Sequence, residues 1–128
     1  MIVLLVEDDT AVRTLAAVLL QKEHFYVLQA CDSDEALRVA RTHQNIDLLL
    51  SDVEMGDGLN GFELGSRILE ERPGLPVLVM SGSPESESKA AGKGIPFLAK
   101  PLTPDTLRQR IREVLVFRLS EFRSGDRS

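Results

Sequence analysis

Five short apolar runs constrain most strongly what this chain can fold into. They are rich in valine, leucine and isoleucine, they do not alternate with polar residues, and they lie at residues 2–6, 25–28, 46–50, 76–80 and 95–98. Such continuous runs are typical of strands buried on both faces, as in a parallel sheet packed between helices. The segments between them carry apolar residues at helical spacing. We therefore expect an α/β protein with a doubly wound parallel sheet and right-handed crossovers.

Local signals predict where the helices begin and end. Thr10 and Ser33 are expected to start the first two helices, and Thr103 the last one, where Pro104 follows at the first helical position. A third helix is expected over residues 61–72, before Pro73 and Gly74. The first helix has a clear apolar stripe, formed by Val12, Leu15, Ala16, Leu19 and Leu20.

The length of 128 residues suits one compact domain, which we expect to span residues 1–117. Residues 118–128 are expected to be a helix end and a disordered tail. No apolar run approaches the roughly 18 residues of a membrane span, and no basic segment precedes the first run as in a secretory signal. We therefore expect a cytoplasmic protein without membrane contact.

Charge and cysteine content exclude several classes of site. The formal net charge of -5 argues against a nucleic-acid surface that covers the domain, although the end from Arg108 onward is rich in arginine. Cys31 is the single cysteine, so an internal disulfide and a zinc–thiolate cluster are excluded. We expect it to be a small buried apolar residue.

Acidic residues follow two of the five runs. Glu7, Asp8 and Asp9 come after the first run, and Asp52 after the third. Open parallel sheets bind ligands at the carboxyl ends of their strands, so neighbouring first and third strands would bring these acids together. Two carboxylates about 4 Å apart repel by roughly 4 kcal/mol at an effective dielectric of about 20. Bound Mg²⁺ would offset that repulsion. The alternative is a solvated or helix-capping acid, which we favour for Asp9.

A hydroxyl and an ammonium group follow two further runs. Ser81 comes after VLVM, and Lys100 after PFLA. Taken singly, such a serine is usually a turn residue and such a lysine a solvated surface group. Together with the acids, they indicate a metal site with room for one phosphoryl group.

These fragments resemble the receiver domain of two-component response regulators. The residues that carry the resemblance are LLVEDD with Arg13 shortly after, DLLLSDVEM with a later NG, VLVMSG, and FLAKPLTPDTL. The resemblance implies a flavodoxin-like (βα)5 fold with strand order 2-1-3-4-5. It also implies a signalling switch that accepts a phosphoryl group from a kinase phosphohistidine. Such a switch is not an enzyme, because it catalyses only its own phosphorylation and dephosphorylation.

The resemblance also assigns roles at the site. Asp52 would be the phosphoacceptor, a carboxylate nucleophile. Glu7 and Asp8 would hold Mg²⁺ together with Asp52 and the backbone carbonyl of Glu54. Lys100 would act with the metal to neutralise charge on the transferring phosphoryl group.

Three further positions match the family's switching parts. Ser81 would be the hydroxyl that moves toward the phosphorylated aspartate, and Phe97 the aromatic ring coupled to that movement. For Phe97 a plain role in the core is the alternative. The peptide bond between Lys100 and Pro101 would be the family's cis peptide, an isomer that X-Pro bonds adopt in about 5–6% of cases.

Two segments depart from the family's pattern. The loop VEMGDGLNG after Asp52 is one residue longer than the commonest form, with Gly56 where proline is usual. The segment SPESESKAAGKG is short and polar and contains glycine, so we expect a stunted or irregular fourth helix.

The second departure affects the expected partners. This segment is part of the output and dimer face in many receivers, and here it is more like receivers of hybrid sensor kinases or single-domain regulators. We expect a sensor histidine kinase or a histidine phosphotransfer protein as partner, and no direct contact with nucleic acid. The resemblance leaves room for a weak homodimer.

Three other functions remain as alternatives. An aspartate-nucleophile phosphohydrolase would use the same groups; Glu54 could imitate its second acid, but the chain has no room for a substrate-covering cap. A flavin-binding module is disfavoured, because Glu7 and Asp8 would repel the phosphate of the ligand. A receiver-like module that accepts no phosphate has no support, because every charged group needed is present.

Overall fold

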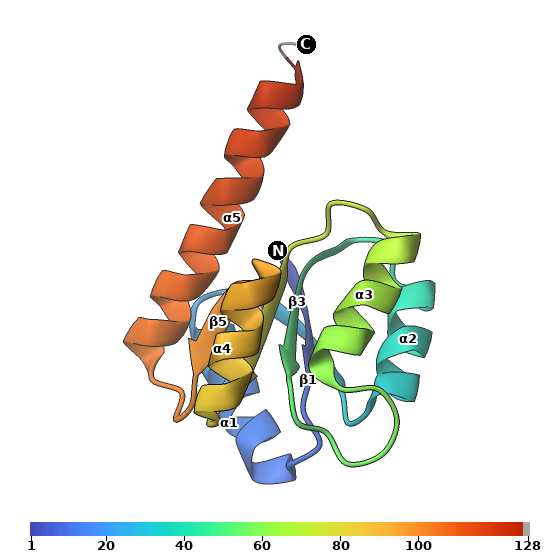
Figure 1. Ribbon diagram of the computed structural model, residues 1–128, viewed down its shortest axis with the longest axis vertical. Coiled ribbons are helices and arrows are strands. Elements are labelled where there is room, and N and C mark those ends of the chain that lie inside the picture. Colours follow the sequence, from blue (N-terminus) through green and yellow to red (C-terminus); the bar gives the residue numbers. More distant parts are fainter. Residues whose placement is uncertain (127–128) are drawn as a thin grey trace.

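The computed structural model describes the backbone of residues 1–126 and the side chains of residues 1–116. Strands and helices alternate strictly along the chain (Figure 1). They are β1 (Ile2–Val6), α1 (Thr10–Lys22), β2 (Tyr26–Ala30), α2 (Ser33–Thr42), β3 (Ile46–Asp52), α3 (Gly61–Glu71), β4 (Val77–Ser81), α4 (Pro84–Lys93), β5 (Phe97–Ala99) and α5 (Pro104–Asp126). The five strands are parallel, in the order β2-β1-β3-β4-β5. The expected doubly wound architecture is confirmed.

The two faces of the sheet have separate apolar cores. Leu4 and Leu49 face α2, α3 and α4, whereas Leu5 and Leu50 face α1 and α5. Figure 1 shows α2 and α3 on one side of the sheet and α5 on the other. Alternate residues of one strand are thus buried on opposite faces, which explains the continuous apolar runs. Each fully buried leucine contributes about 1.5–3 kcal/mol relative to an exposed one.

The strand register brings the carboxyl ends of the strands to one edge of the sheet. Val6 at the end of β1 pairs with Ser51, so that Glu7 emerges beside Asp52. On the other side of β3, Asp52 pairs with Met80, the residue before Ser81.

Helices α1 and α2 begin at Thr10 and Ser33 as expected, but the N-cap of α1 is the residue before Thr10. Asp9 is the N-cap of α1 and accepts the Val12 amide at 3.0 Å, and Asp32 caps α2 in the same way. Thr10 is therefore a first helical residue rather than a cap, and the capping role favoured for Asp9 is confirmed. The buried stripe of α1 also differs, because Leu15 is 49% exposed and the buried residues are Ala16, Ala17, Leu19 and Leu20.

Helix α4 is regular, so the expectation of a stunted or irregular helix is wrong. Its apolar stripe is indeed weak, since only Ser86 and Ala90 are buried. Both ends are well terminated instead. The Ser83 side chain caps the start, Pro84 occupies the first turn, and the chain leaves the helix at Gly94 with φ 68°. These caps stabilise the helix at both ends, although few of its side chains are buried.

Helix α5 continues as far as Asp126, past the domain end expected at residue 117, and projects beyond the sheet (Figure 1). The expected disorder of the tail stays a prediction, and residues 127–128 lie outside the described part of the chain. No helix among the described residues is long and apolar enough to cross a membrane. Cys31, expected to be buried, is exposed in the turn before α2.

Candidate functional site

Four of the predicted site residues stand at successive strand ends. Glu7 directly follows β1, Asp52 and Ser81 are the last residues of β3 and β4, and Lys100 directly follows β5. Glu7, Asp52 and Ser81 are 0%, 4% and 1% exposed. The parallel register therefore gathers two acids, a hydroxyl and an ammonium group at one edge of the sheet, with most of their surface withdrawn from water.

Lys100 joins the two buried acids. Its ammonium Nζ lies 2.6 Å from Glu7 Oε1 and 3.2 Å from Asp52 Oδ1. The lysine backbone is held in turn, because its N–H donates to the carbonyl of Ser81 at 3.0 Å. The next peptide bond, between Lys100 and Pro101, is cis.

Charges in the site alter the acidity of Asp52 and Lys100. Burial and the neighbouring Glu7 carboxylate raise the pKa of Asp52 from 3.8 to about 7, although Lys100 acts in the opposite direction. Burial alone would lower the pKa of Lys100, but the hydrogen bond to Glu7 and the charge of Asp52 outweigh it and raise that pKa. One cation therefore does not fully compensate two buried carboxylates.

Glu7, Asp8 and Asp52 form an oxygen cluster suited to a metal ion. One carboxylate oxygen from each lies within 4.8 Å of the other two. Asp52 Oδ1 is buried and has no hydrogen-bond partner in the described part of the chain, although Lys100 is near. Hard carboxylate oxygens with an unmet need for positive charge fit a hard divalent cation such as Mg²⁺. The cluster thus has the chemistry of a magnesium site.

The surroundings of Asp8 and Glu7 hold this cluster in place. Asp8 is exposed, and its Oδ2 accepts the amide of Gly56 at 3.0 Å. Proline at position 56 has no N–H and would lose this bond. Arg13, one of the residues of the resemblance, donates to the backbone carbonyl of Glu7 at 2.7 Å.

A hydrogen-bonded group beside the acids was not predicted from the sequence. Oε1 of Glu54 accepts the hydroxyl of Ser81 at 2.6 Å and the hydroxyl of Ser86, on α4, at 2.7 Å. Although burial opposes it, these two hydrogen bonds lower the pKa of Glu54. The expectations for Glu54 are a backbone carbonyl that binds metal and, in the phosphohydrolase alternative, a second acid; neither includes these contacts with serine. The signal that could have drawn attention to the side chain is an acid two residues after Asp52, facing a serine-rich helix start.

The NG pair after the loop lets α3 approach the site closely. Asn60 caps α3 in a reciprocal capping box with Glu63. A side chain at Gly61 would collide with the backbone carbonyl of Asp52 and lie 2.9 Å from the Cα of Val53. Glycine is needed there because the helix start touches the strand end that carries Asp52.

Phe97 is half-buried at the start of β5. It packs against the core shared with α2, α3 and α4. This position is compatible with both the switching role and the plain core role, so the movement of its ring stays a prediction.

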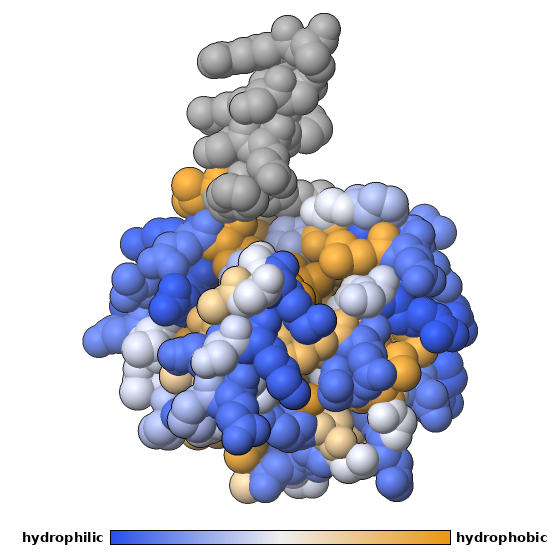
Figure 2. Space-filling model, in the orientation of Figure 1, coloured by the Kyte–Doolittle hydropathy of each residue, from blue (hydrophilic) through white to orange (hydrophobic). Residues whose placement is uncertain are grey.

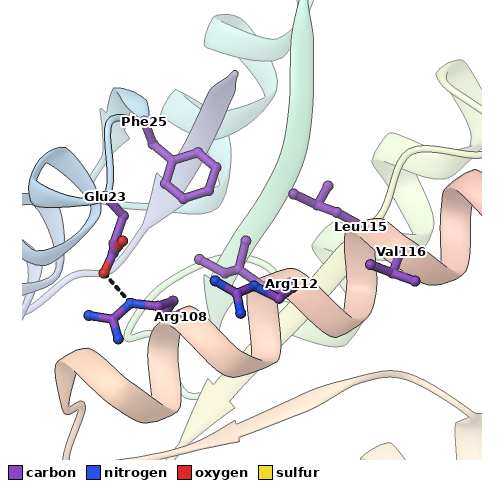
Figure 3. A pocket seen from close by; sticks show the side chains of 7 residues that line it. Glu23, Phe25, Arg108, Arg112, Leu115 and Val116 are labelled. Carbon is purple, nitrogen blue, oxygen red and sulfur yellow. Dashed lines mark hydrogen bonds and ion pairs between the residues drawn. The ribbon is translucent and has the colours of Figure 1, made fainter.

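A hollow on another part of the surface contains none of these strand-end groups. It lies between α5 and the start of β2, and is lined by Glu23, Phe25, Arg108, Ile111, Arg112, Leu115 and Val116 (Figure 3). Arg108 pairs with Glu23 at its rim. Figure 2 shows apolar surface close to where α5 leaves the domain. With a mostly apolar lining and no cluster of acids, this hollow lacks the chemistry of a phosphoryl site.

Comparisons with a family model, with related sequences and with solved structures agree on one family. The model of the response regulator receiver domain matches residues 3–112. The transcriptional regulatory protein GlrR of Escherichia coli is 35% identical over 88% of this chain. The chain spans only 26% of the length of that relative.

Two solved structures agree in fold as well as in sequence. The receiver domain of the hybrid histidine kinase CckA has 36% identity and a TM-score of 0.74, over 90% of this chain and 99% of that one. The chemotaxis protein CheY4 of Vibrio cholerae has 30% identity and a TM-score of 0.78, over 89% of this chain and 98% of that one. Receiver domains are signalling switches rather than classical enzymes. Because both the family model and the solved structures match, the chain belongs to the response regulator receiver domain family.

Proposed function

We propose that this chain is a phosphoryl-accepting switch in which Asp52 takes a phosphoryl group from a phosphohistidine. One observation carries the proposal: Asp52 lies within 4.8 Å of Glu7 and Asp8, measured between carboxylate oxygens, and 3.2 Å from the ammonium of Lys100. A nucleophilic oxygen, oxygen ligands and a cation are thus within reach of one phosphoryl group.

The chemistry is an in-line displacement at phosphorus. An ionised oxygen of Asp52 forms the new O–P bond while the N–P bond of the donor breaks, and the imidazole nitrogen keeps the electron pair. Lys100 stands where it can neutralise charge on the phosphoryl oxygens and hold Asp52 in place. Dephosphorylation is the attack of water on the same phosphorus atom. In both reactions the phosphoryl group is gained or lost at this chain's own Asp52, so the chain acts on itself and not as an enzyme on other substrates.

Mg²⁺ is the proposed cofactor. Glu7, Asp8, Asp52 and the backbone carbonyl of Glu54 would hold it, and it would supply positive charge to the carboxylates and to the phosphoryl oxygens. The raised pKa of Asp52 supports this assignment, because the ionised nucleophile needs more compensation than Lys100 provides.

Ser81 and Phe97 are the proposed switch. The Ser81 hydroxyl would turn toward the phosphoryl group, and the half-buried ring of Phe97 would move into the space released. Ser81 ends β4, and Phe97 lies on the neighbouring strand β5, where it pairs with Val79, two residues before Ser81; this proximity supports the pairing.

The surface beside Lys100 supports a partner that presents an apolar face. Val12, Leu15, Pro101 and Leu102 line a hollow next to the lysine, and Leu15 is 49% exposed. A sensor histidine kinase or a histidine phosphotransfer protein is the proposed partner, which would dock there with its histidine toward Asp52. The absence of direct nucleic-acid contact, a cytoplasmic location and a weak homodimer stay predictions, and GlrR, one of the relatives, is a transcriptional regulator.

Intact-mass measurement after incubation with acetyl phosphate tests the proposal. We expect one phosphoryl group per chain with Mg²⁺, none after chelation, and none in Asp52→Asn. Asp57→Asn is the matched control, because Asp57 is exposed in the same loop and is absent from the oxygen cluster. A wild-type protein that gains no mass where a known receiver does, or labelling that survives Asp52→Asn, would overturn it.

The phosphohydrolase alternative gains no support from Glu54. The carboxylate that would imitate the second acid of such an enzyme is occupied by two serine hydroxyls. Turnover of a panel of phosphate esters would nevertheless favour that alternative.

A further inference from the structure

One carboxylate oxygen connects three segments around the site. Oε1 of Glu54, in the loop after β3, accepts the hydroxyl of Ser81 at the end of β4 and the hydroxyl of Ser86 in the first turn of α4. Both serines are buried, at 1% and 7% exposure, while Glu54 itself is exposed. The carboxylate therefore reaches inward from the surface to satisfy two buried donors.

The Ser81 hydroxyl already donates its proton in this arrangement. Its single proton points to Glu54 at 2.6 Å, and its oxygen accepts the amide of Ser83 at 2.9 Å. A hydroxyl has only one proton to donate. Ser81 therefore has no proton for a phosphoryl oxygen on Asp52 until its bond to Glu54 breaks.

The arrival of a phosphoryl group would weaken this arrangement in two ways. Phosphorylation adds negative charge on Asp52, two residues from Glu54, and like charges repel. The phosphoryl oxygens are also strong acceptors that compete for the Ser81 proton. Because Glu54 is exposed, its carboxylate can turn into water at little cost once it is displaced.

We propose that the Glu54 carboxylate is a latch that holds the Ser81 hydroxyl and the start of α4 in their unphosphorylated positions. Release of the latch frees Ser81 for the phosphoryl group and frees Ser86, so that the start of α4 changes when Asp52 is modified. Glu54 is thus a positioning residue, and Ser86 belongs to the switch through its hydrogen bond to Glu54. The inference rests on the proposed function of Asp52.

Beryllofluoride with Mg²⁺ provides the test, because it imitates the phosphoryl group without covalent transfer. The measurement is its dissociation constant for the wild type, Glu54→Ala, Ser86→Ala and Ser88→Ala. We expect beryllofluoride to bind about fivefold to tenfold more tightly in Glu54→Ala and about threefold more tightly in Ser86→Ala. In both variants, hydrogen bonds to the charged Glu54 carboxylate that would have to break on binding are already absent. Ser88→Ala is the matched control, an exposed serine on the same helix, and should equal the wild type.

A double-mutant cycle separates the latch from simple charge repulsion. Glu54→Ala is also made in a chain that carries Ser81→Ala and Ser86→Ala. If Glu54 acts through the two hydroxyls, its removal has no further effect in that background. An equal gain in both backgrounds means that only the negative charge of Glu54 matters, and overturns the latch.

Amide hydrogen exchange at residues 83 and 85–87 supplies a readout that needs no bound anion. The latch predicts faster exchange there in free Glu54→Ala and Ser86→Ala than in Ser88→Ala. Unchanged exchange together with unchanged anion affinity overturns the inference and leaves the proposed function standing. A wild-type chain that binds no beryllofluoride and gains no phosphoryl mass overturns the proposed function, and this inference with it.

Discussion

The buried and exposed parts of the site are built differently. The floor, which we define as Glu7, Asp52 and Lys100, stands on strand ends and is held by the sheet. The rim, which we define as Asp8 and Glu54, consists of exposed residues. The rim carboxylates are bound by groups that other partners can replace, namely the Gly56 amide and two serine hydroxyls.

This difference teaches how a rigid fold can contain a switch. The floor residues sit close to groups of the same and opposite charge, so their geometry determines the chemistry at Asp52. The rim residues can exchange protein hydrogen bonds for water, metal or phosphoryl contacts without disturbing the sheet. We therefore expect floor substitutions to change the chemistry strongly, and rim substitutions to change mainly the balance between states.

The largest effect is expected from Lys100→Met, which removes the only floor cation. Without the ammonium, charge on the phosphoryl oxygens is less compensated, and the rate of labelling by acetyl phosphate should fall by about 100-fold. Lys89→Met, an exposed lysine on α4, is the control and should label like the wild type. The rate is followed by intact mass over time. A rate within twofold of the control would mean that the floor does not act through Lys100.

The second effect is a pH dependence of stability in metal-free protein. The pKa of Asp52 rises from 3.8 to about 7 on folding, so the folded state binds more protons than the unfolded state within that window. The free energy of unfolding should therefore fall as pH rises from about 4 to about 7, by on the order of 3 kcal/mol from this group.

Denaturant unfolding at several pH values measures this dependence. Asp52→Asn has no group to ionise at this position, so its free energy of unfolding should not show this fall with rising pH. In the wild type above pH 7, added Mg²⁺ should restore the lost stability. A wild-type curve parallel to that of Asp52→Asn would show that the floor carries no unfavourable charge.

The smallest effect is expected at the rim, from Gly56→Pro. This substitution removes the amide that holds Asp8, and should cost about 1 kcal/mol in unfolding free energy relative to Gly56→Ala. Gly56→Ala keeps the N–H, and its side chain would make an ordinary contact 3.6 Å from Asp8. Mg²⁺ affinity should differ between the two variants by less than about threefold, since ligand oxygens are unchanged. A loss as large as that from a floor substitution would erase the distinction between floor and rim.

The sequence predicts the floor better than the rim, for a physical reason. Glu7, Asp52 and Lys100 could be placed because parallel strands end at one edge, and a run of apolar residues marks where each strand ends. The contact of Glu54 with Ser86 depends on how far α4 lies from a loop, which no periodicity records. Such contacts become visible only in three dimensions.

Local errors have equally specific causes. Asp9 and Thr10 are adjacent, and both residue types can cap a helix. The sequence does not show which of the two has the extended backbone of an N-cap and which is the first helical residue. Leu15 fits the helical stripe of α1, yet it is exposed beside Lys100 and Pro101, on the surface proposed for the partner. The weak apolar stripe of α4 favours an irregular helix, but the caps at Ser83 and Gly94 are enough to delimit a regular one.

Mapping the phosphoryl group tests the central claim most directly. After labelling with acetyl phosphate and Mg²⁺, borohydride reduces an acyl phosphate to the corresponding alcohol, and peptide mass spectrometry locates the altered residue. We predict reduction at Asp52 alone, and none when Mg²⁺ is chelated. Reduction at Asp8, Glu54 or any other acid, with Asp52 unmodified, would contradict the account.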